Sequence, residues 1–184
     1  MILFINACVR NESRTKRLAH AYLSRRDEPV AELCLHTISF PTVDEDFLSL
    51  RDRLILSGDY NNPLFDLARL FSEADEIVIA APFWDLSFPA KLKQYFEFIN
   101  IKGITFRYTP EGIPEGLCRA KRLTYVTTVG GNYFPEEYGF GYVKALAKNF
   151  YGIREVKLIK AVGLDIDGAD VEEILKSAEE EIRE

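Results

Sequence analysis

Short apolar runs alternate along the chain with segments whose apolar residues recur at helical spacing. The run Ile2–Asn6 is typical of a strand buried on both faces of a sheet, and further short runs rich in apolar residues also predict strands. These expected strands cover residues 2–6, 30–35, 76–80, 122–128 and 156–161. The segments with helical spacing predict amphipathic helices. They cover residues 14–25, 44–56, 64–73, 90–99, 142–150 and 169–182.

This alternation of strands and helices predicts an α/β protein. A strand, a helix and a further strand in succession are typical of a parallel sheet that helices cover on both faces. Five strands fit a three-layer α/β/α arrangement with strand order 2-1-3-4-5. A short additional pair is expected between residues 105–108 and a segment near Leu117. No repeat, low-complexity tract or linker divides the sequence, so residues 1–184 are expected to form a single domain.

Composition excludes several classes of function. The 184 residues carry a formal net charge of −6, with a pI near 5.1, which argues against nucleic-acid binding. No run approaches the ~20 apolar residues needed to cross a bilayer, so no membrane insertion is expected. Three widely spaced cysteines lack the C-x-x-C spacing, and no metal-ligand set is apparent. We expect a cytoplasmic protein.

The predicted strand order points to one edge of the sheet as the ligand site. In open α/β sheets, ligands bind beyond the carboxyl ends of the strands, where the strand order reverses. For the order 2-1-3-4-5, this point lies between the first and third strands. The loops 7–15, 81–88 and 128–134 therefore contain the candidate site residues.

The first of these loops carries charges and hydroxyl groups directly before a helix. A helix N-terminus attracts anions through its free backbone N–H groups and its dipole. Ser13 and Thr15 add hydroxyl donors, and Arg10 and Arg14 add positive charge. An ordinary helix cap by Ser13, with both arginines in solvent, explains the same residues. The loop lacks the glycines of a P-loop or a dinucleotide-binding motif.

Planar side chains and glycines mark the other two loops. Phe83 and Trp84 follow a predicted strand, and their rings could stack on a flat heterocycle or fill the core. Gly130 and Gly131 could let backbone N–H groups approach a ligand, or form a plain turn. Each loop alone is ambiguous, but all three are expected at the same edge of the sheet.

In combination, these loops resemble those of the flavodoxin-like FMN-dependent NADH azoreductases and NAD(P)H:quinone oxidoreductases. The most specific stretch is 80–93, which reads Ala-Ala-Pro-Phe-Trp-Asp-Leu-Ser-Phe-Pro-Ala-Lys-Leu-Lys. It is supported by Gly-Ile-Thr-Phe-Arg-Tyr at 103–108, the strand ending in Gly-Gly at 121–131, and 149–153. The resemblance is weakest over 37–63.

The resemblance implies FMN as cofactor, NADH or NADPH as electron donor, and a small aromatic acceptor such as a quinone or azo compound. It also implies two-electron transfer with ping-pong kinetics, and a homodimer with the site at the subunit interface. The first loop would bind the phosphate, the second the ring system and ribityl chain, and the third the pyrimidine edge. The implied cofactor contacts are Arg10, Ser13, Arg14, Thr15, Pro82, Phe83, Trp84, Asp85, Leu86, Thr128, Val129, Gly130 and Gly131.

Three residues are expected to act in the chemistry itself. The backbone N–H groups of Gly130 and Gly131 would stabilise the negative charge of the reduced flavin. Tyr133 is a candidate donor of a proton or hydrogen bond, although a packing role explains it equally well.

The chain departs from the family pattern at several positions. Ala7 and Cys8 stand where relatives often carry serine, Asp85 where azoreductases often have asparagine, and Val129 where many have a polar residue. Two alternatives therefore stay open beside the enzyme. One is an FMN-binding electron carrier or redox sensor without a dedicated organic substrate. The other is a fold relative that binds no FMN and serves as an interaction module.

Overall fold

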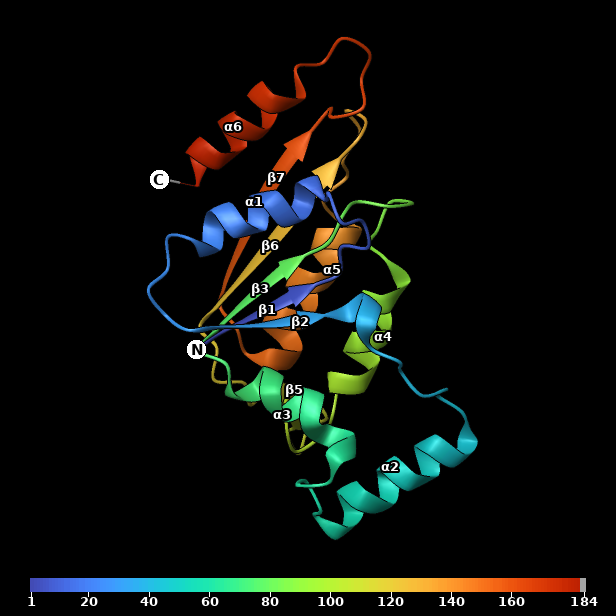
Figure 1. Cartoon of the computed structure of the whole chain (residues 1–184). Helices are drawn as coiled ribbons and strands as arrows, with labels where there is room; N and C mark the ends of the chain where they lie inside the picture. The colour runs from blue at the N-terminus through green and yellow to red at the C-terminus, as the bar shows by residue number, and fades with distance from the viewer. Residues whose placement is uncertain (183–184) are drawn as a thin grey trace.

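Five parallel strands form the centre of the computed structural model, which describes residues 1–182 (Figure 1). They are β1 (Ile2–Asn6), β2 (Val30–Cys34), β3 (Glu76–Ala80), β6 (Arg122–Val129) and β7 (Glu155–Val162). Their order is β2-β1-β3-β6-β7, and every neighbouring pair is parallel. Counted in chain order within this sheet, the strands follow the predicted order 2-1-3-4-5, which is confirmed.

Helices cover both faces of the sheet, as expected (Figure 1). On one face lie α1 (Arg14–Leu23) and α6 (Val171–Glu181). On the other lie α3 (Asp66–Glu73), α4 (Ala90–Ile99) and α5 (Gly139–Leu146). The predicted small pair is also present, formed antiparallel by β4 (Phe106–Tyr108) and β5 (Pro114–Gly116). No helix within residues 1–182 combines the length and apolar character needed to cross a membrane.

The sheet separates two apolar cores. Successive side chains of a strand point to opposite faces, so β1 contributes to both. Leu3 and Ile5 pack with residues of α3, α4 and α5, whereas Ile2 and Phe4 pack with residues of α1 and α6. All five residues of β1 are buried, which is the burial that its continuous apolar run predicts.

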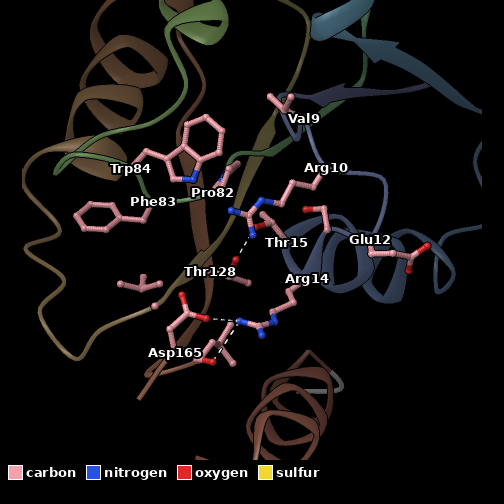
Figure 2. Close-up of a pocket in the computed structure, with 14 residues that line it drawn as sticks. Val9, Arg10, Glu12, Arg14, Thr15, Pro82, Phe83, Trp84, Thr128 and Asp165 are labelled. Carbon is pink, nitrogen blue, oxygen red and sulfur yellow. Dashed lines mark hydrogen bonds and ion pairs between the residues drawn. The ribbon is translucent and has the colours of Figure 1, made fainter. Parts of the chain in front are cut away.

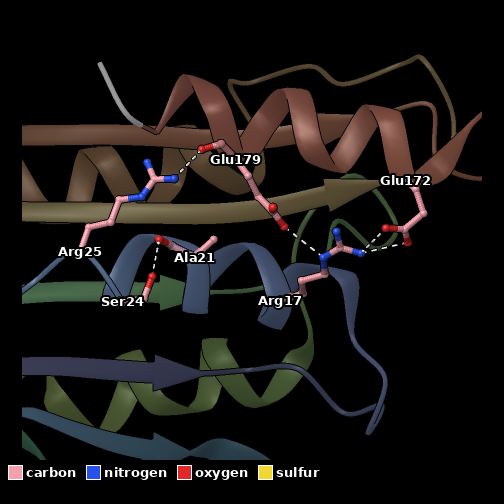
Figure 3. A network of polar contacts seen from close by, with 6 residues as sticks. All are labelled: Arg17, Ala21, Ser24, Arg25, Glu172 and Glu179. Carbon is pink, nitrogen blue, oxygen red and sulfur yellow. Dashed lines mark hydrogen bonds and ion pairs between the residues drawn. The ribbon is translucent and has the colours of Figure 1, made fainter.

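Ion pairs at the surface join α1 to α6 (Figure 3). Arg17 donates from Nη1 to the Glu172 carboxylate at 2.8 Å and from Nε to Glu179 Oε1 at 3.0 Å. Arg25 Nη2 donates to the main-chain oxygen of Glu179 at 2.9 Å. Such exposed pairs contribute little stability, and the apolar residues that α1 and α6 share with the sheet hold the two helices together.

The segment 37–63, where the sequence pattern is weakest, contains the expected helix. This helix is α2 (Glu45–Ser57), which begins after the cap residue Asp44 and ends at Gly58, whose φ of 71° is left-handed. None of its residues is fully buried, and Figure 1 shows it lying away from the sheet. It contacts the rest of the molecule partly through Phe47, whose ring lies 5.2 Å from that of Phe98.

Two fully buried tyrosines under the sheet give a matched test of the core. Tyr151 donates its hydroxyl to Asn100 Oδ1 at 2.7 Å, whereas the Tyr95 hydroxyl has no hydrogen-bond partner within the described residues. Removing a satisfied buried hydroxyl costs about 1 kcal/mol, but removing an unsatisfied one costs nothing. We therefore expect Tyr151→Phe to lower the free energy of unfolding by about 1 kcal/mol. Tyr95→Phe should leave it unchanged or raise it.

Urea unfolding of both variants measures this difference. An equal loss of stability in the two variants would contradict the hydrogen-bond assignment.

Candidate functional site

A cavity of about 280 Å³ lies at the carboxyl edge of the sheet (Figure 2). It is lined from the loops after β1, β3 and β6, which are the three predicted loops, and also from the loop after β7. The lining residues are Val9, Arg10, Glu12, Ser13, Arg14, Thr15, Pro82, Phe83, Trp84, Thr128, Val129, Gly130, Leu164 and Asp165.

Hydroxyl groups at the start of α1 face the end of β6. Ser13 caps the helix by accepting from the N–H of Lys16 at 3.2 Å, as the alternative interpretation of this loop expected. Its hydroxyl also lies within hydrogen-bonding reach of the Cys8 thiol, so a ligand would compete with Cys8 for its proton. Thr15 Oγ1 lies 2.5 Å from Thr128 Oγ1. Because one of these two hydroxyls donates to the other, the second proton is left for a ligand.

The two arginines of the first loop are engaged differently. Arg10 points into the cavity in Figure 2 and makes no hydrogen bond or ion pair within residues 1–182. Arg14 instead donates from Nη1 to Asp165 Oδ1 at 2.7 Å and to the main-chain oxygen of Leu164 at 3.1 Å. The positive charge of Arg14 is thus compensated, and that of Arg10 is not.

The loop after β3 presents rings to the cavity. The Trp84 side chain lines the cavity and is 42 % exposed, so it does not fill the core. Phe83 is held edge-on against Phe134, with ring centroids 4.9 Å apart. The sequence left stacking and core filling open for these rings, and their placement in the cavity wall favours stacking.

The next two predicted residues, Asp85 and Leu86, lie in a tight turn and do not line this cavity. Trp84 and Ser87 exchange two backbone hydrogen bonds, of 3.1 and 2.7 Å, around Asp85 and Leu86. Both central residues are left-handed, with φ of 51° and 64°, as this kind of two-residue turn requires. Asp85 and Leu86 therefore line a neighbouring cavity of about 510 Å³.

The glycines after β6 are bonded to the loop after β7. Gly130 O accepts from the N–H of Asp165 at 2.8 Å, and Gly131 O accepts from that of Gly163 at 3.1 Å. A Cβ at Gly130 would lie 2.4 Å from Asp165 Oδ2, so a side chain there would collide with this carboxylate. Gly131 does not line the cavity, and neither does Tyr133, whose side chain is 71 % exposed.

Most of the predicted contact residues thus meet at one cavity, while four predicted site residues lie outside its wall. Those four are Asp85, Leu86, Gly131 and Tyr133. The residues that sequence reasoning missed are Val9, Glu12, Leu164 and Asp165. Leu164 and Asp165 could have been found, because β7 is parallel to β6 and must end at the same edge of the sheet.

The cysteines offer no activated nucleophile. Burial raises the pKa of the Cys8 thiol, although a hydrogen bond with Ser13 opposes this. Burial also raises the pKa of Cys118, to about 12. At Cys34, burial and the hydrogen bond to Glu32 both raise the pKa. Since the thiolate is the reactive form, thiol chemistry is not a property of this site.

Comparison with known proteins identifies the family. The family model described as "Flavodoxin-like fold" matches residues 1–184. An FMN-dependent NADH:quinone oxidoreductase of Clostridium perfringens is 35% identical over 184 residues, which cover 95% of this chain and 92% of that protein. A second, from Lachnoclostridium phytofermentans, is 36% identical over 97% of this chain and 94% of its own length.

Solved structures agree with this result. An azoreductase from Bacillus anthracis Sterne has a TM-score of 0.84 at 26% identity, covering 98% of this chain and 95% of its own. An FMN-dependent NADH-azoreductase from Bacillus anthracis Ames Ancestor, in complex with FMN, has a TM-score of 0.80 at 26% identity, covering 98% and 94%. The chain is therefore a flavodoxin-like protein. Within that class, it belongs to the family of the FMN-dependent NADH:quinone oxidoreductases and azoreductases, as its loops indicated.

The strained turn beside the cavity gives a test of its backbone. A left-handed residue with a Cβ costs about 1 kcal/mol, and only glycine avoids this cost. Leu86→Gly should therefore be more stable than Leu86→Ala by about 1 kcal/mol, because both remove the side chain but only glycine relieves the backbone. Thermal unfolding of the two variants measures the difference. Equal stabilities would show that residue 86 is not left-handed in solution.

Proposed function

We propose that this protein is an FMN-dependent oxidoreductase that takes electrons from NADH or NADPH and passes them to a small aromatic acceptor. The observation that carries the proposal is the division of the cavity into two parts. Hydroxyl groups, a helix N-terminus and the uncompensated Arg10 gather on one side, and Pro82, Phe83 and Trp84 on the other. FMN has the same two parts, a phosphate dianion and a flat ring system.

The start of α1 suits a phosphate group. Its first helical hydrogen bond runs from the N–H of Arg17 to Ser13 O at 2.9 Å, so the N–H groups of Arg14 and Thr15 precede the helical ladder. They have no hydrogen-bond partner within the described residues. With the hydroxyl groups of Ser13 and Thr15 and the guanidinium of Arg10, they form a set of donors at the start of the helix.

The remaining residues would orient the ring and stabilise charge. When bound, FMN supplies the redox chemistry, accepting a hydride from the nicotinamide and returning two electrons to the acceptor. The N–H groups of Gly130 and Gly131 are proposed to stabilise the negative charge of the reduced state, with Gly130 at the cavity wall. Tyr133, exposed on the same loop, is proposed as a hydrogen-bond donor to the acceptor.

A neighbouring apolar surface favours an enzyme over a simple electron carrier. The second cavity, of about 510 Å³, adjoins the Trp84 turn and exposes Leu86, Tyr138 and Tyr142. We propose that quinones, azo compounds or similar flat acceptors enter from this side. Donor and acceptor would then use the same place in turn, which gives ping-pong kinetics.

Subunit association and location complete the proposal. Aromatic side chains are enriched in protein interfaces, and the exposed Tyr138 and Tyr142 lie beside the candidate site. A homodimer formed through this surface would bring the partner next to the cavity, and sedimentation velocity measures it. The three free cysteines fit a reducing, cytoplasmic location.

Purified protein tests the activity directly. We expect a yellow protein that releases FMN on heating, and whose visible flavin absorbance bleaches within about a second of mixing with NADH or NADPH, as typical turnover rates require. Addition of a quinone should then restore the colour. Stable FMN without bleaching would instead support the electron carrier or redox sensor, and a protein that binds no FMN would support the interaction module.

The hydroxyl groups at α1 give a second prediction. Hydrogen bonds to a charged group contribute about 1.5–3 kcal/mol, so Ser13→Ala and Thr15→Val should each weaken FMN binding by roughly tenfold to a hundredfold. Fluorescence quenching during FMN titration measures the affinity. Because Ser13 also caps α1, Asp44→Ala is the matched control: it removes the cap of α2, far from the cavity. Unchanged affinity in both site variants would show that the phosphate binds elsewhere on the protein.

A further inference from the structure

An ion pair across the end of β6 joins the start of α1 to a loop that is distant in the sequence. Arg14 belongs to α1 and Asp165 to the loop after β7, 151 residues further on. Both side chains line the cavity, and Figure 2 shows the guanidinium and the carboxylate facing each other. The pair is therefore part of the cavity wall.

Arg14 is held through one nitrogen atom and keeps most of its donors. Its Nη1 serves both acceptors, Asp165 Oδ1 and the main-chain oxygen of Leu164. A guanidinium carries five N–H groups, and those on Nε and Nη2 have no partner within residues 1–182. A donor group that is already ordered loses less conformational entropy when it binds a ligand.

The backbone that carries Asp165 is held by hydrogen bonds. Its N–H donates to Gly130 O at 2.8 Å, and the preceding N–H, of Leu164, donates to Val129 O at 3.1 Å. Its carboxylate also occupies the space that a side chain at residue 130 would need. Two backbone hydrogen bonds thus fix the loop that carries Asp165, and the absence of a side chain at residue 130 leaves room for its carboxylate.

We propose that Asp165 is a positioning residue for the cofactor: it holds Arg14 so that its free N–H groups serve the FMN phosphate. The inference rests on the proposed function, and it goes beyond the phosphate contacts expected from the first loop alone. If Asp165 did not position Arg14, removing its carboxylate would have the opposite effect on FMN affinity. An unpaired carboxylate in this wall would repel the phosphate dianion, and its removal would strengthen FMN binding.

A double-mutant cycle separates these roles. We expect Asp165→Asn to raise the dissociation constant for FMN about tenfold in the wild-type background. In an Arg14→Gln background, the same change should alter it less than twofold, because the group that Asp165 positions is then gone. Asp167→Asn is the matched control, since it removes an exposed carboxylate from the same loop and should leave the affinity unchanged.

Salt dependence gives a readout that a purely structural role would not move. If Arg14 contacts the phosphate, FMN affinity falls steeply with ionic strength in the wild type and less steeply in both Asp165→Asn and Arg14→Gln. Tighter FMN binding by Asp165→Asn, or an equal loss in both backgrounds, would overturn the inference. Unchanged affinity in Asp165→Asn, with normal FMN binding by the wild type, overturns the inference alone. A wild type that binds no FMN overturns the proposed function as well.

Discussion

The position of β1 between β2 and β3 is the constraint on which the rest of the structure depends. The chain leaves β1, adds β2 on one side, and then crosses to add β3 on the other. The helices after β1 and β3 consequently cover opposite faces of the sheet, and the loops that lead into them separate. The space between these loops is the cavity, and parallel pairing brings the ends of β6 and β7 to the same edge.

The alternation of strand and helix patterns was sufficient to predict this architecture, and it is plainest at β1, where burial on both faces requires an apolar residue at nearly every position. The run Ile2–Asn6 is uninterrupted and fully buried, and both neighbours of β1 are strands that the pattern also predicts. Tertiary contacts between distant segments cannot be predicted from the local sequence pattern in the same way. The helix α5 begins at Gly139, three residues before the predicted start. A Cβ at Gly139 would lie 3.3 Å from Ser87 O, a close approach that no local pattern reveals.

The site shows the same division between local and long-range signals. Ser13 and Thr15 could be found because helix capping and anion binding have local sequence rules. The direction in which Asp85 and Leu86 point could not be predicted. A turn with two left-handed residues normally has glycine at its second position, and here that position is Leu86. Asp165 escaped notice because its partner is 151 residues away. Its loop was nevertheless implied by the strand order.

The charge of the whole chain is a poor guide to this site. A net charge of −6 disfavours anions at long range, but salt screens such fields within about 8 Å at physiological ionic strength. Four charged side chains line the cavity, Arg10, Arg14, Glu12 and Asp165, and their formal charges cancel. Their arrangement matters more than their sum. Asp165 is paired with Arg14, whereas Arg10 has no partner within the described residues, so a phosphate bound at the start of α1, as proposed, would meet the free N–H groups of both arginines.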